Sequence, residues 1–349
     1  MVESVIKILT HGAIAFILGI ALTPILTHYL FKYKLWKKTT RNKSMDGGEM
    51  PVFQKFHADT EAKTPRLGGI LIWTIPAIMA LLFFIFSEID GPIFDKLNFL
   101  SRSQTWLPLF AMVAASLVGL LDDFLTVKDK GKYSGKGLSL KFRIISVFLI
   151  GVIGALWFFF KLDWRTLHIP GNGDIFMGIW YIPFFILVML AVYSGGVVDG
   201  LDGLAGGNFA TIFGAFAIIA GFRGQYDLAA LCAAIMGALL AFLWFNIPPA
   251  RFYMGESGSM GLCTALTIIA FLTDSVLVLP IIGLVLVAEA GSVILQQLSK
   301  KFLKRKLFIA SPIHYHFEAK GWPHYKITMR FWVIGIICAI IGVAIRLLG

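Results

Sequence analysis

Long apolar segments recur along almost the whole chain, and they limit the folds open to it. A helix of about 20 apolar residues crosses the hydrocarbon layer of a membrane, which is roughly 30 Å thick. The chain is also 58% hydrophobic and only 15% charged, which excludes a single soluble core. We therefore predict an all-α polytopic membrane protein, folded as one domain over 1–349, with about ten transmembrane helices. The apolar segments are 5–31, 67–87, 105–122, 142–160, 177–196, 205–222, 227–246, 258–273, 275–297 and 331–348.

The basic residues indicate how these helices are oriented. Most of the chain's 31 Lys and Arg residues fall in 32–66, 128–143 and 300–330, on one side of a ten-helix arrangement. Loops on the cytoplasmic side of a membrane carry an excess of Lys and Arg. We expect these segments to face the cytoplasm and both termini to face outward. Topology and anionic lipid head groups then explain the net charge of +11 better than nucleic-acid binding does.

The cysteines and one outward loop carry no chemistry in this interpretation. Cys232, Cys263 and Cys338 fall inside predicted helices without a CxxC spacing, so they indicate packing residues and not a disulfide framework or a zinc site. The loop 161–176 contains a turn-rich run that favours a small hairpin. We assign this loop no catalytic role.

Two pairs of acids stand at the ends of predicted helices, where a charge is costly unless it has a function. Asp122 and Asp123 end the third apolar segment, and a divalent cation or a bound proton relieves the repulsion between such neighbours. Solvated acids are the plainer interpretation, but a helix C-terminus disfavours negative charge. Asp199 and Asp202 follow the fifth segment among closely spaced glycines. They share a face if this stretch is helical; if the helix is broken, the glycines let backbone approach a ligand.

Two further segments on the same side carry ionisable groups. Glu256 opens the eighth apolar segment after a Pro-Pro pair, and on this segment alone helix capping explains it as well as metal binding does. His314 and His316 lie in the last basic loop. Two histidines without a nearby Cys or a third His support zinc only weakly, so contacts to phosphate suit them better.

Together these loops bring carboxylates, histidines and lysines to one side of the membrane. Oxygen ligands combined with substrate phosphates are the usual environment of Mg²⁺. The sequence has no GxxxxGK[ST], HExxH or GxSxG run, so P-loop, zinc-protease and nucleophile-elbow chemistry lack support. We therefore predict a phosphate-transferring enzyme.

The motifs and their order resemble those of the polyprenyl-phosphate N-acetylhexosamine-1-phosphate transferases, over most of the chain. The resemblance rests on Thr64 to Gly69, the Asp122–Asp123 pair, Val198 to Ala205, Phe242 to Asn246, Met254 to Ser259 and His314 to Pro323. The acid motifs are common to the whole superfamily. The last segment, followed by Arg330-Phe331-Trp332, is similar to the muramoyl-pentapeptide branch.

This resemblance implies an activity, a cofactor and partners. The enzyme would use Mg²⁺ to move phospho-N-acetylmuramoyl-pentapeptide from UDP-N-acetylmuramoyl-pentapeptide to undecaprenyl phosphate, giving lipid I and UMP, in the first membrane step of peptidoglycan synthesis. The resemblance also implies a homodimer in the bacterial cytoplasmic membrane, with the active site facing the cytoplasm.

The resemblance assigns roles to individual residues as well. The catalytic set is Asp122, Asp123, Asp199, Glu256 and His314, of which Glu256, Asp122 and Asp199 would bind the metal. Uridine would be held by Asp202, Asn246 and Tyr253, the last as a stacking ring, with Gln296, His314 and the backbone of Gly255 completing the nucleotide pocket. Lys63 and Lys136 would approach the diphosphate, and Thr64 and His316 complete the substrate-binding set.

Four positions depart from the family's pattern. They are Glu256 for an aspartate, Tyr315 for the central residue of a triple-His run, Gly196 for an asparagine and Arg66 for a threonine. Arg66 is similar to the branch that acts on teichoic-acid and O-antigen precursors, so a UDP-GlcNAc or related sugar-1-phosphate transferase is the alternative within this class. A secondary transporter is the alternative outside it, because transporters also contain buried acids and broken helices. Direct attack by the lipid phosphate and a two-step route through an aspartyl-phosphate are both open.

Overall fold

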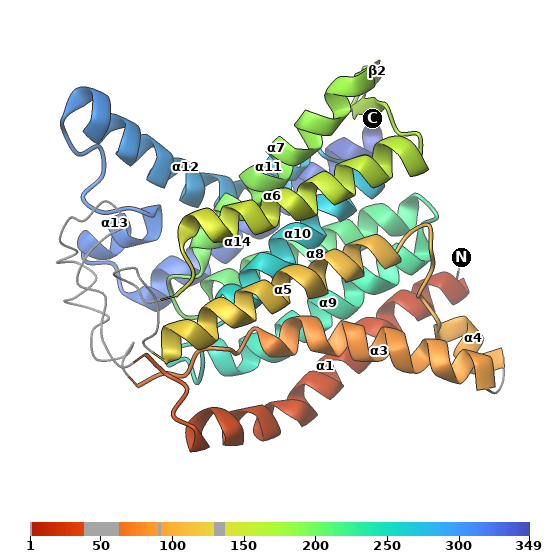
Figure 1. The fold of residues 1–349 in the computed structure, drawn as a ribbon, viewed down its shortest axis with the longest axis horizontal. Helices are drawn as coiled ribbons and strands as arrows, with labels where there is room; N and C mark the ends of the chain where they lie inside the picture. The colour runs from red at the N-terminus through yellow and green to blue at the C-terminus, as the bar shows by residue number, and fades with distance from the viewer. Residues whose placement is uncertain (1, 38–62, 90–91, 129–136) are drawn as a thin grey trace.

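The computed structural model describes residues 2–37, 63–89, 92–128 and 137–349, and this part of the chain is helical apart from one short hairpin (Figure 1). The first half contains α1 (Val2–Lys32), α3 (Ile70–Ile89), α4 (Pro92–Leu97), α5 (Trp106–Val127), α6 (Leu140–Leu156), η1 (Trp157–Lys161), β1 (Thr166–Ile169) and β2 (Gly173–Phe176). The second half contains η2 (Gly178–Trp180), α7 (Tyr181–Ser194), η3 (Gly195–Val198), α8 (Leu204–Phe222), α9 (Tyr226–Asn246), α10 (Glu256–Leu272), α11 (Leu279–Ile282), α12 (Leu284–Leu298), η4 (Ser299–Leu303), α13 (Ile313–Ala319) and α14 (His324–Leu348).

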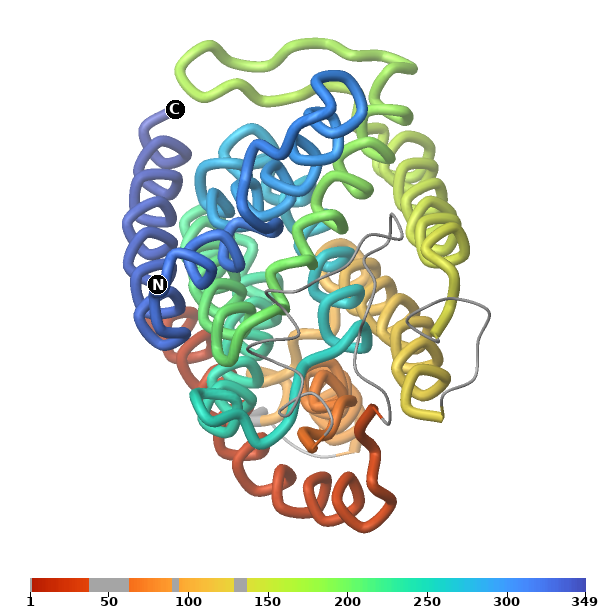
Figure 2. The backbone as a smooth tube through the Cα atoms, turned by 90° about the vertical axis from the view of Figure 1, so that its left-hand side faces the viewer, coloured from red at the N-terminus to blue at the C-terminus, as the bar shows by residue number. Residues whose placement is uncertain are grey.

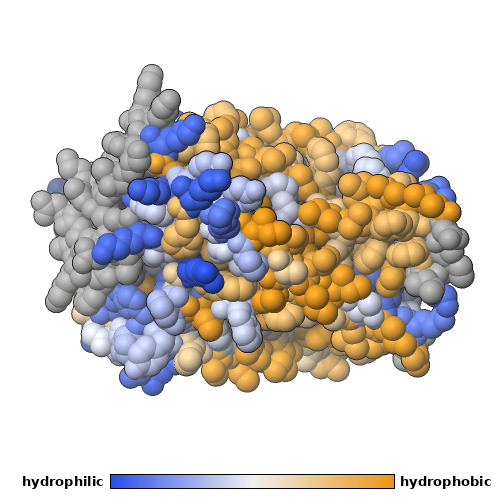
Figure 3. Space-filling model, turned by 90° about the horizontal axis from the view of Figure 1, so that it is seen from below, coloured by the Kyte–Doolittle hydropathy of each residue, from blue (hydrophilic) through white to orange (hydrophobic). Residues whose placement is uncertain are grey.

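The long helices have the length and composition of membrane spans. Within the described ranges, eight helical segments are long and apolar enough to cross a membrane: α1, α3, α5, α6 with η1, α7 with its flanking turns, α8, α9 and α14. Figure 3 shows a broad apolar band between two more polar ends. These features confirm the predicted all-α multi-pass membrane protein.

The other two predicted segments differ from simple spans. The segment 258–273 corresponds to α10, which is apolar but has only 17 residues. The segment 275–297 is divided at Gly283 into α11 and α12, and α12 leans away from the bundle (Figure 1). The total of ten spans and the side of the membrane on which the termini lie stay predictions.

Helices α8, α9 and α10 form the centre of the bundle. The apolar windows of α8 and α9 are 78% and 72% buried inside the protein, compared with 17% for α1. Helices α5 and α10 approach so closely that a Cβ atom on Gly119 would lie 2.2 Å from the carbonyl oxygen of Glu256. Small residues permit such contacts between membrane helices. This packing places the acids at the end of α5 beside the start of α10.

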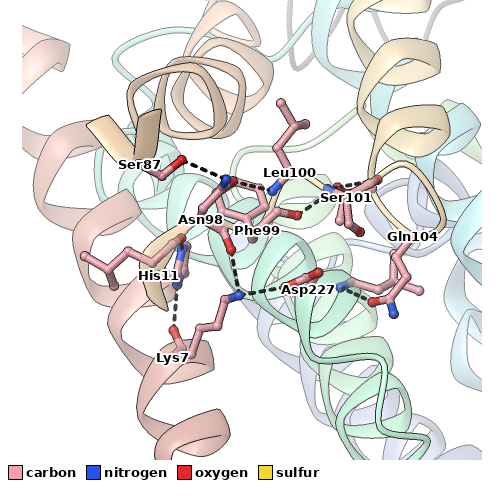
Figure 4. Close-up of polar contacts among 12 residues, drawn as sticks. Lys7, His11, Ser87, Asn98, Phe99, Leu100, Ser101, Gln104 and Asp227 are labelled. Atoms are coloured by element: carbon pink, nitrogen blue, oxygen red, sulfur yellow. Dashed lines mark hydrogen bonds and ion pairs between the residues drawn. The ribbon is translucent and has the colours of Figure 1, made fainter. Parts of the chain in front are cut away.

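A polar network joins the helices at the end of the molecule that carries the N-terminus (Figure 4). Lys7 Nζ on α1 donates to the carbonyl oxygen of Asn98 at 2.7 Å and to Asp227 Oδ1 on α9 at 2.6 Å. His11 is fully buried between the carbonyl oxygens of Lys7 and Leu97, at 2.6 and 2.8 Å from its two ring nitrogens. Because polar groups near the apolar layer must be satisfied internally, we interpret this network as structural.

The predicted hairpin in the loop 161–176 is confirmed. Strands β1 and β2 pair antiparallel from Thr166↔Phe176 to Ile169↔Gly173. The hairpin lies near the end of α14 (Figure 2), where His168 Nε2 is 2.8 Å from the carbonyl oxygen of Gly349. Both termini therefore lie at the same end of the molecule, opposite α13 (Figure 1).

Candidate active site

Asp123 closes the start of α10. Its carboxylate, which is fully buried, accepts hydrogen bonds from the backbone N–H groups of Glu256 at 3.1 Å and Ser257 at 2.9 Å. Gly255 has a φ of +72°, and a Cβ atom there would lie 2.4 Å from Asp123 Oδ2, so only glycine fits this position. Asp123 therefore caps α10 in this structure. The capping interaction that the sequence analysis considered for Glu256 is made by Asp123.

The stretch between α7 and α8 is a broken helix, which decides between the two alternatives for Asp199 and Asp202. Helix α7 ends at Ser194, a 3₁₀ turn follows, and α8 begins at Leu204 after Gly203 in the left-handed region. Asp199 Oδ2 accepts a hydrogen bond from the backbone N–H of Gly255 at 3.0 Å. Burial raises the pKa of Asp199 to about 6, although the Arg66 charge opposes this shift. This turn, residues 199–203, therefore contacts the start of α10.

Two residues predicted to hold uridine join this turn to the segment 247–253. Asp202 Oδ2 accepts from the backbone N–H of Ala250 at 2.9 Å. Asn246 is buried; its Oδ1 accepts from Gly203 N at 3.0 Å, and its Nδ2 donates to the Phe252 carbonyl oxygen at 2.8 Å. In this structure both side chains position loops around the site.

The segment 63–69 lies beside Tyr253. Tyr253 N donates to the Pro65 carbonyl oxygen at 2.8 Å, and Gly68 N donates to the Tyr253 carbonyl oxygen at 2.9 Å. These bonds bring Thr64, half-buried, and Lys63, exposed, to the predicted nucleotide region. Lys136 lies outside the described residues, so its predicted contact with the diphosphate stays a prediction.

Arg143 is the site residue that the sequence reasoning missed. Its Nη1 atom forms an ion pair with Glu256 Oε1 and lies 4.0 Å from Asp122 Oδ2, and its side chain is only 11% exposed. Asp122 Oδ1 accepts a hydrogen bond from Leu138 N at 2.6 Å, so Asp122 also fixes the backbone just before α6. In the sequence Arg143 is the last residue of the basic segment 128–143. Its place in the first turn of an apolar helix, where a charge is expensive, is the signal that identifies it.

The histidine segment reaches the same end of the bundle through α12 and α13. His314 is fully buried, and its Nδ1 is 2.8 Å from Glu289 Oε2 on α12. Gln296 Oε1 accepts from Leu307 N and Phe308 N, both at 2.9 Å, so in this structure its amide holds a loop. His316 Nδ1 accepts from Ile309 N at 3.2 Å. His314 lies next to Gly200 of the 199–203 turn.

The carboxylates of the site outnumber its guanidinium groups. Among the described residues, the acids are Asp122, Asp123, Asp199, Asp202 and Glu256. Arg143 pairs with Glu256 and lies 4.0 Å from Asp122, and the Arg66 charge acts on Asp123 and Asp199. Such an excess of oxygen donors suits a hard divalent cation such as Mg²⁺. Asp123 has both carboxylate oxygens on backbone N–H groups, whereas Asp122 and Asp199 each use one oxygen in this way. Asp122, Asp199 and Glu256 are therefore the candidate ligands, and Mg²⁺ binding by these three residues stays a prediction.

Another group of possible metal ligands lies at the opposite end of the molecule. His168, Asp174 and Asp274 have donor atoms within 4.8 Å of one another, the one such group of three within the described ranges. His168 pairs with Asp174 at 2.8 Å, and Asp274 lies 3.9 Å from Arg223. At the candidate active site, by contrast, Arg143 lies between Asp122 and Glu256, so their oxygens do not converge in this arrangement.

The capping role of Asp123 makes a testable prediction. Asp123→Ala removes the acceptor for two buried N–H groups, which costs about 0.5–2 kcal/mol for a helix cap. We expect its thermal unfolding in detergent to fall below that of the wild type, whereas Asp122→Asn, which keeps an oxygen for Leu138 N, unfolds near the wild-type temperature. Equal unfolding temperatures for Asp123→Ala and the wild type would contradict the capping role.

Comparison with known proteins defines the class and then the family. The profile of glycosyl transferase family 4 matches residues 105–274, which contain the acids Asp122, Asp123, Asp199, Asp202 and Glu256. Together with the membrane helices, this match makes the chain a multi-pass membrane transferase.

The chain is 36% identical over 342 residues to the phospho-N-acetylmuramoyl-pentapeptide-transferase of Geobacillus kaustophilus, covering 96% of each chain. It is 38% identical to that of Bacillus pumilus over 81% of this chain and 84% of the relative, and 33% identical to that of Listeria welshimeri over 98% and 99%. The chain belongs to the phospho-N-acetylmuramoyl-pentapeptide-transferase family, which rules out the transporter alternative.

Proposed function

We propose that this enzyme transfers phospho-N-acetylmuramoyl-pentapeptide from UDP-N-acetylmuramoyl-pentapeptide to undecaprenyl phosphate, and that it releases UMP and forms lipid I. The observation that carries the proposal is the meeting of the acid-bearing ends of α5, α7 and α10 at one end of an apolar bundle, in a chain whose relatives bear this transferase name. A lipid acceptor in the membrane and a water-soluble nucleotide sugar can both reach such a site. We place this end in the cytoplasm because the basic segment 300–330, which contains α13, lies at this end (Figure 1). We place the protein in a bacterial cytoplasmic membrane, and we expect a homodimer.

The described residues have distinct tasks in this reaction. An oxygen of the lipid phosphate attacks the β-phosphorus of the nucleotide sugar, and the bond from that phosphorus to the oxygen of the departing UMP breaks. Asp122, which lies 4.0 Å from Arg143, orients the attacking phosphate or takes its proton. Arg143 and Arg66 offer guanidinium groups to the phosphates. Tyr253, next to Thr64 and Arg66, stacks on the uracil ring.

Mg²⁺ is the proposed cofactor, held by Asp122, Asp199 and Glu256. When bound, the ion neutralises negative charge that develops on the diphosphate. Asp199 is fixed through Gly255 N and Glu256 stands at the first position of α10, so both carboxylates are supported by the backbone of the α10 start. Asp123 supports them indirectly by capping the same helix.

A radiochemical assay tests the substrate. Purified protein in detergent receives Mg²⁺, undecaprenyl phosphate and UDP-N-acetylmuramoyl-pentapeptide labelled in the sugar, and the label that enters the organic phase is measured together with UMP. We expect equal amounts of lipid-linked label and UMP, and neither product without the lipid. Turnover with UDP-GlcNAc in place of the muramoyl substrate would instead assign the enzyme as a UDP-GlcNAc sugar-1-phosphate transferase. Arg66 is the residue that favours this alternative.

A further inference from the structure

A buried pair of ionisable side chains lies behind the acids of the candidate active site. Glu289 on α12 and His314 on α13 are both fully buried, and Glu289 Oε2 lies 2.8 Å from His314 Nδ1. An ionised carboxylate only accepts hydrogen bonds, so the proton of this bond belongs to Nδ1. The pair therefore fixes both the orientation of the imidazole ring and the nitrogen that carries this proton.

The second ring nitrogen is left without a partner. Among the residues that the structure describes, His314 Nε2 is buried and makes no hydrogen bond. A buried polar atom in this condition costs about 1–3 kcal/mol, and such atoms gather where a ligand supplies the missing partner.

Nε2 is turned to the loop that carries two of the site acids. A Cβ atom on Gly200 would lie 2.3 Å from Nε2 and 2.7 Å from Cε1 of His314. Gly200 is half-buried and stands between Asp199 and Asp202, so the glycine leaves the nitrogen next to the backbone of the turn. Tyr315, the next residue, donates its hydroxyl to the Gly200 carbonyl oxygen at 3.3 Å. Glu289 therefore holds the imidazole through Nδ1, and Tyr315 holds the neighbouring turn through the Gly200 carbonyl oxygen.

We propose that Glu289 is a positioning residue that holds the imidazole of His314 with Nε2 at the 199–203 turn, where Nε2 forms a hydrogen bond to the bound nucleotide sugar. This inference rests on the proposed function. Through Glu289, α12, the helix that leans away from the bundle (Figure 1), then orients a residue that binds the substrate. Glu289 itself touches no substrate.

The connection predicts non-additive effects. In Glu289→Leu the ring loses its fixed orientation, and by analogy with partners that orient metal-bound histidines we expect kcat/KM to fall about 10–100-fold. In Glu289→Gln the amide oxygen still accepts from Nδ1, so most of the activity stays. In a His314→Asn background, which has already lost the contact, Glu289→Leu should lower kcat/KM by less than about 3-fold, because residues that act as a unit are not additive. A purely structural role of Glu289 would lower both backgrounds equally.

The experiment measures kcat/KM with UDP-N-acetylmuramoyl-pentapeptide for the wild type, both single variants and the double variant, after size-exclusion chromatography has shown each to be monodisperse. Ser292→Ala is the matched control: this buried serine on the same helix donates only to the Glu289 carbonyl oxygen, at 2.7 Å, and its loss should leave kcat/KM unchanged. If Glu289→Leu is not monodisperse, Glu289→Asp replaces it, since its carboxylate is one methylene short of Nδ1. Additive losses, or a Glu289→Leu enzyme as active as the wild type, would overturn the inference. An inactive wild type would instead overturn the proposed function.

Discussion

Asp122→Asn is expected to lose transfer activity on the order of 10²–10⁴-fold, the range for removal of a group that handles a proton in the transition state. The asparagine oxygen still accepts from Leu138 N, where Asp122 Oδ1 now lies at 2.6 Å, so the entry to α6 is kept. What disappears is the negative charge that faces Arg143 at 4.0 Å. We therefore expect a folded, inactive enzyme, measured by UMP release and by thermal unfolding side by side.

Glu256 supplies the matched comparison for Asp122. Glu256→Gln removes a proposed metal ligand and should be similarly inactive, whereas Glu256→Asp keeps a carboxylate and should retain measurable turnover. Excess Mg²⁺ should increase the turnover of Glu256→Asp more than that of the wild type, since a shorter side chain weakens the metal site without removing its charge. Wild-type rates in both Asp122→Asn and Glu256→Gln would contradict the assignment of these acids.

Arg143→Met is expected to cause the largest loss of stability among the site variants. It removes the guanidinium group that pairs with Glu256 and lies 4.0 Å from Asp122, in a side chain that is only 11% exposed. Removing one partner of a buried ion pair costs about 3–5 kcal/mol. Without Mg²⁺ we expect a markedly lower unfolding temperature in detergent, together with loss of turnover because a guanidinium group no longer meets the phosphates.

Mg²⁺ distinguishes this explanation from a simple packing defect. If the ion binds the same carboxylates, millimolar Mg²⁺ should raise the unfolding temperature of Arg143→Met more than that of the wild type, because it neutralises charges that Arg143 otherwise neutralises. Lys141→Met is the control, since Lys141 is exposed on the same turn of α6. Equal responses to Mg²⁺ in Arg143→Met and the wild type would show that the ion does not share the partners of Arg143.

The sequence was sufficient to predict most of the long apolar helices because their signal is local. A run of about 20 apolar residues becomes a helix wherever it lies, and the helices over 5–31 and 227–246 were therefore predicted to within a few residues. The division of 275–297 at Gly283 was not predicted. Pro280 and Gly283 interrupt this apolar run and are the local signal for the division.

The sequence indicated acids that meet at one end of the bundle, but the contact that each of them makes could not be predicted. Asp122 and Asp123 are neighbours in the sequence, yet one faces Arg143 and the other caps α10, more than 130 residues away. Glu289 and Arg143 each lie inside an apolar run, where a charge is expensive, but their partners His314 and Glu256 lie far along the chain and could not be predicted. Asn246 was predicted to hold uridine, whereas here its amide joins two loops. These distinctions depend on contacts between distant segments, which only the folded structure supplies.

The most direct test of the central claim is the position of the metal. Crystals of the enzyme grown with Mn²⁺ in place of Mg²⁺ would show the ion through its anomalous scattering. We predict a peak between Asp122, Asp199 and Glu256, at the roughly 2.0–2.6 Å separations that oxygen ligands keep from hard cations, with Arg143 moved from Glu256. A peak only at His168, Asp174 and Asp274, or an active enzyme whose acids hold no ion, would contradict the account.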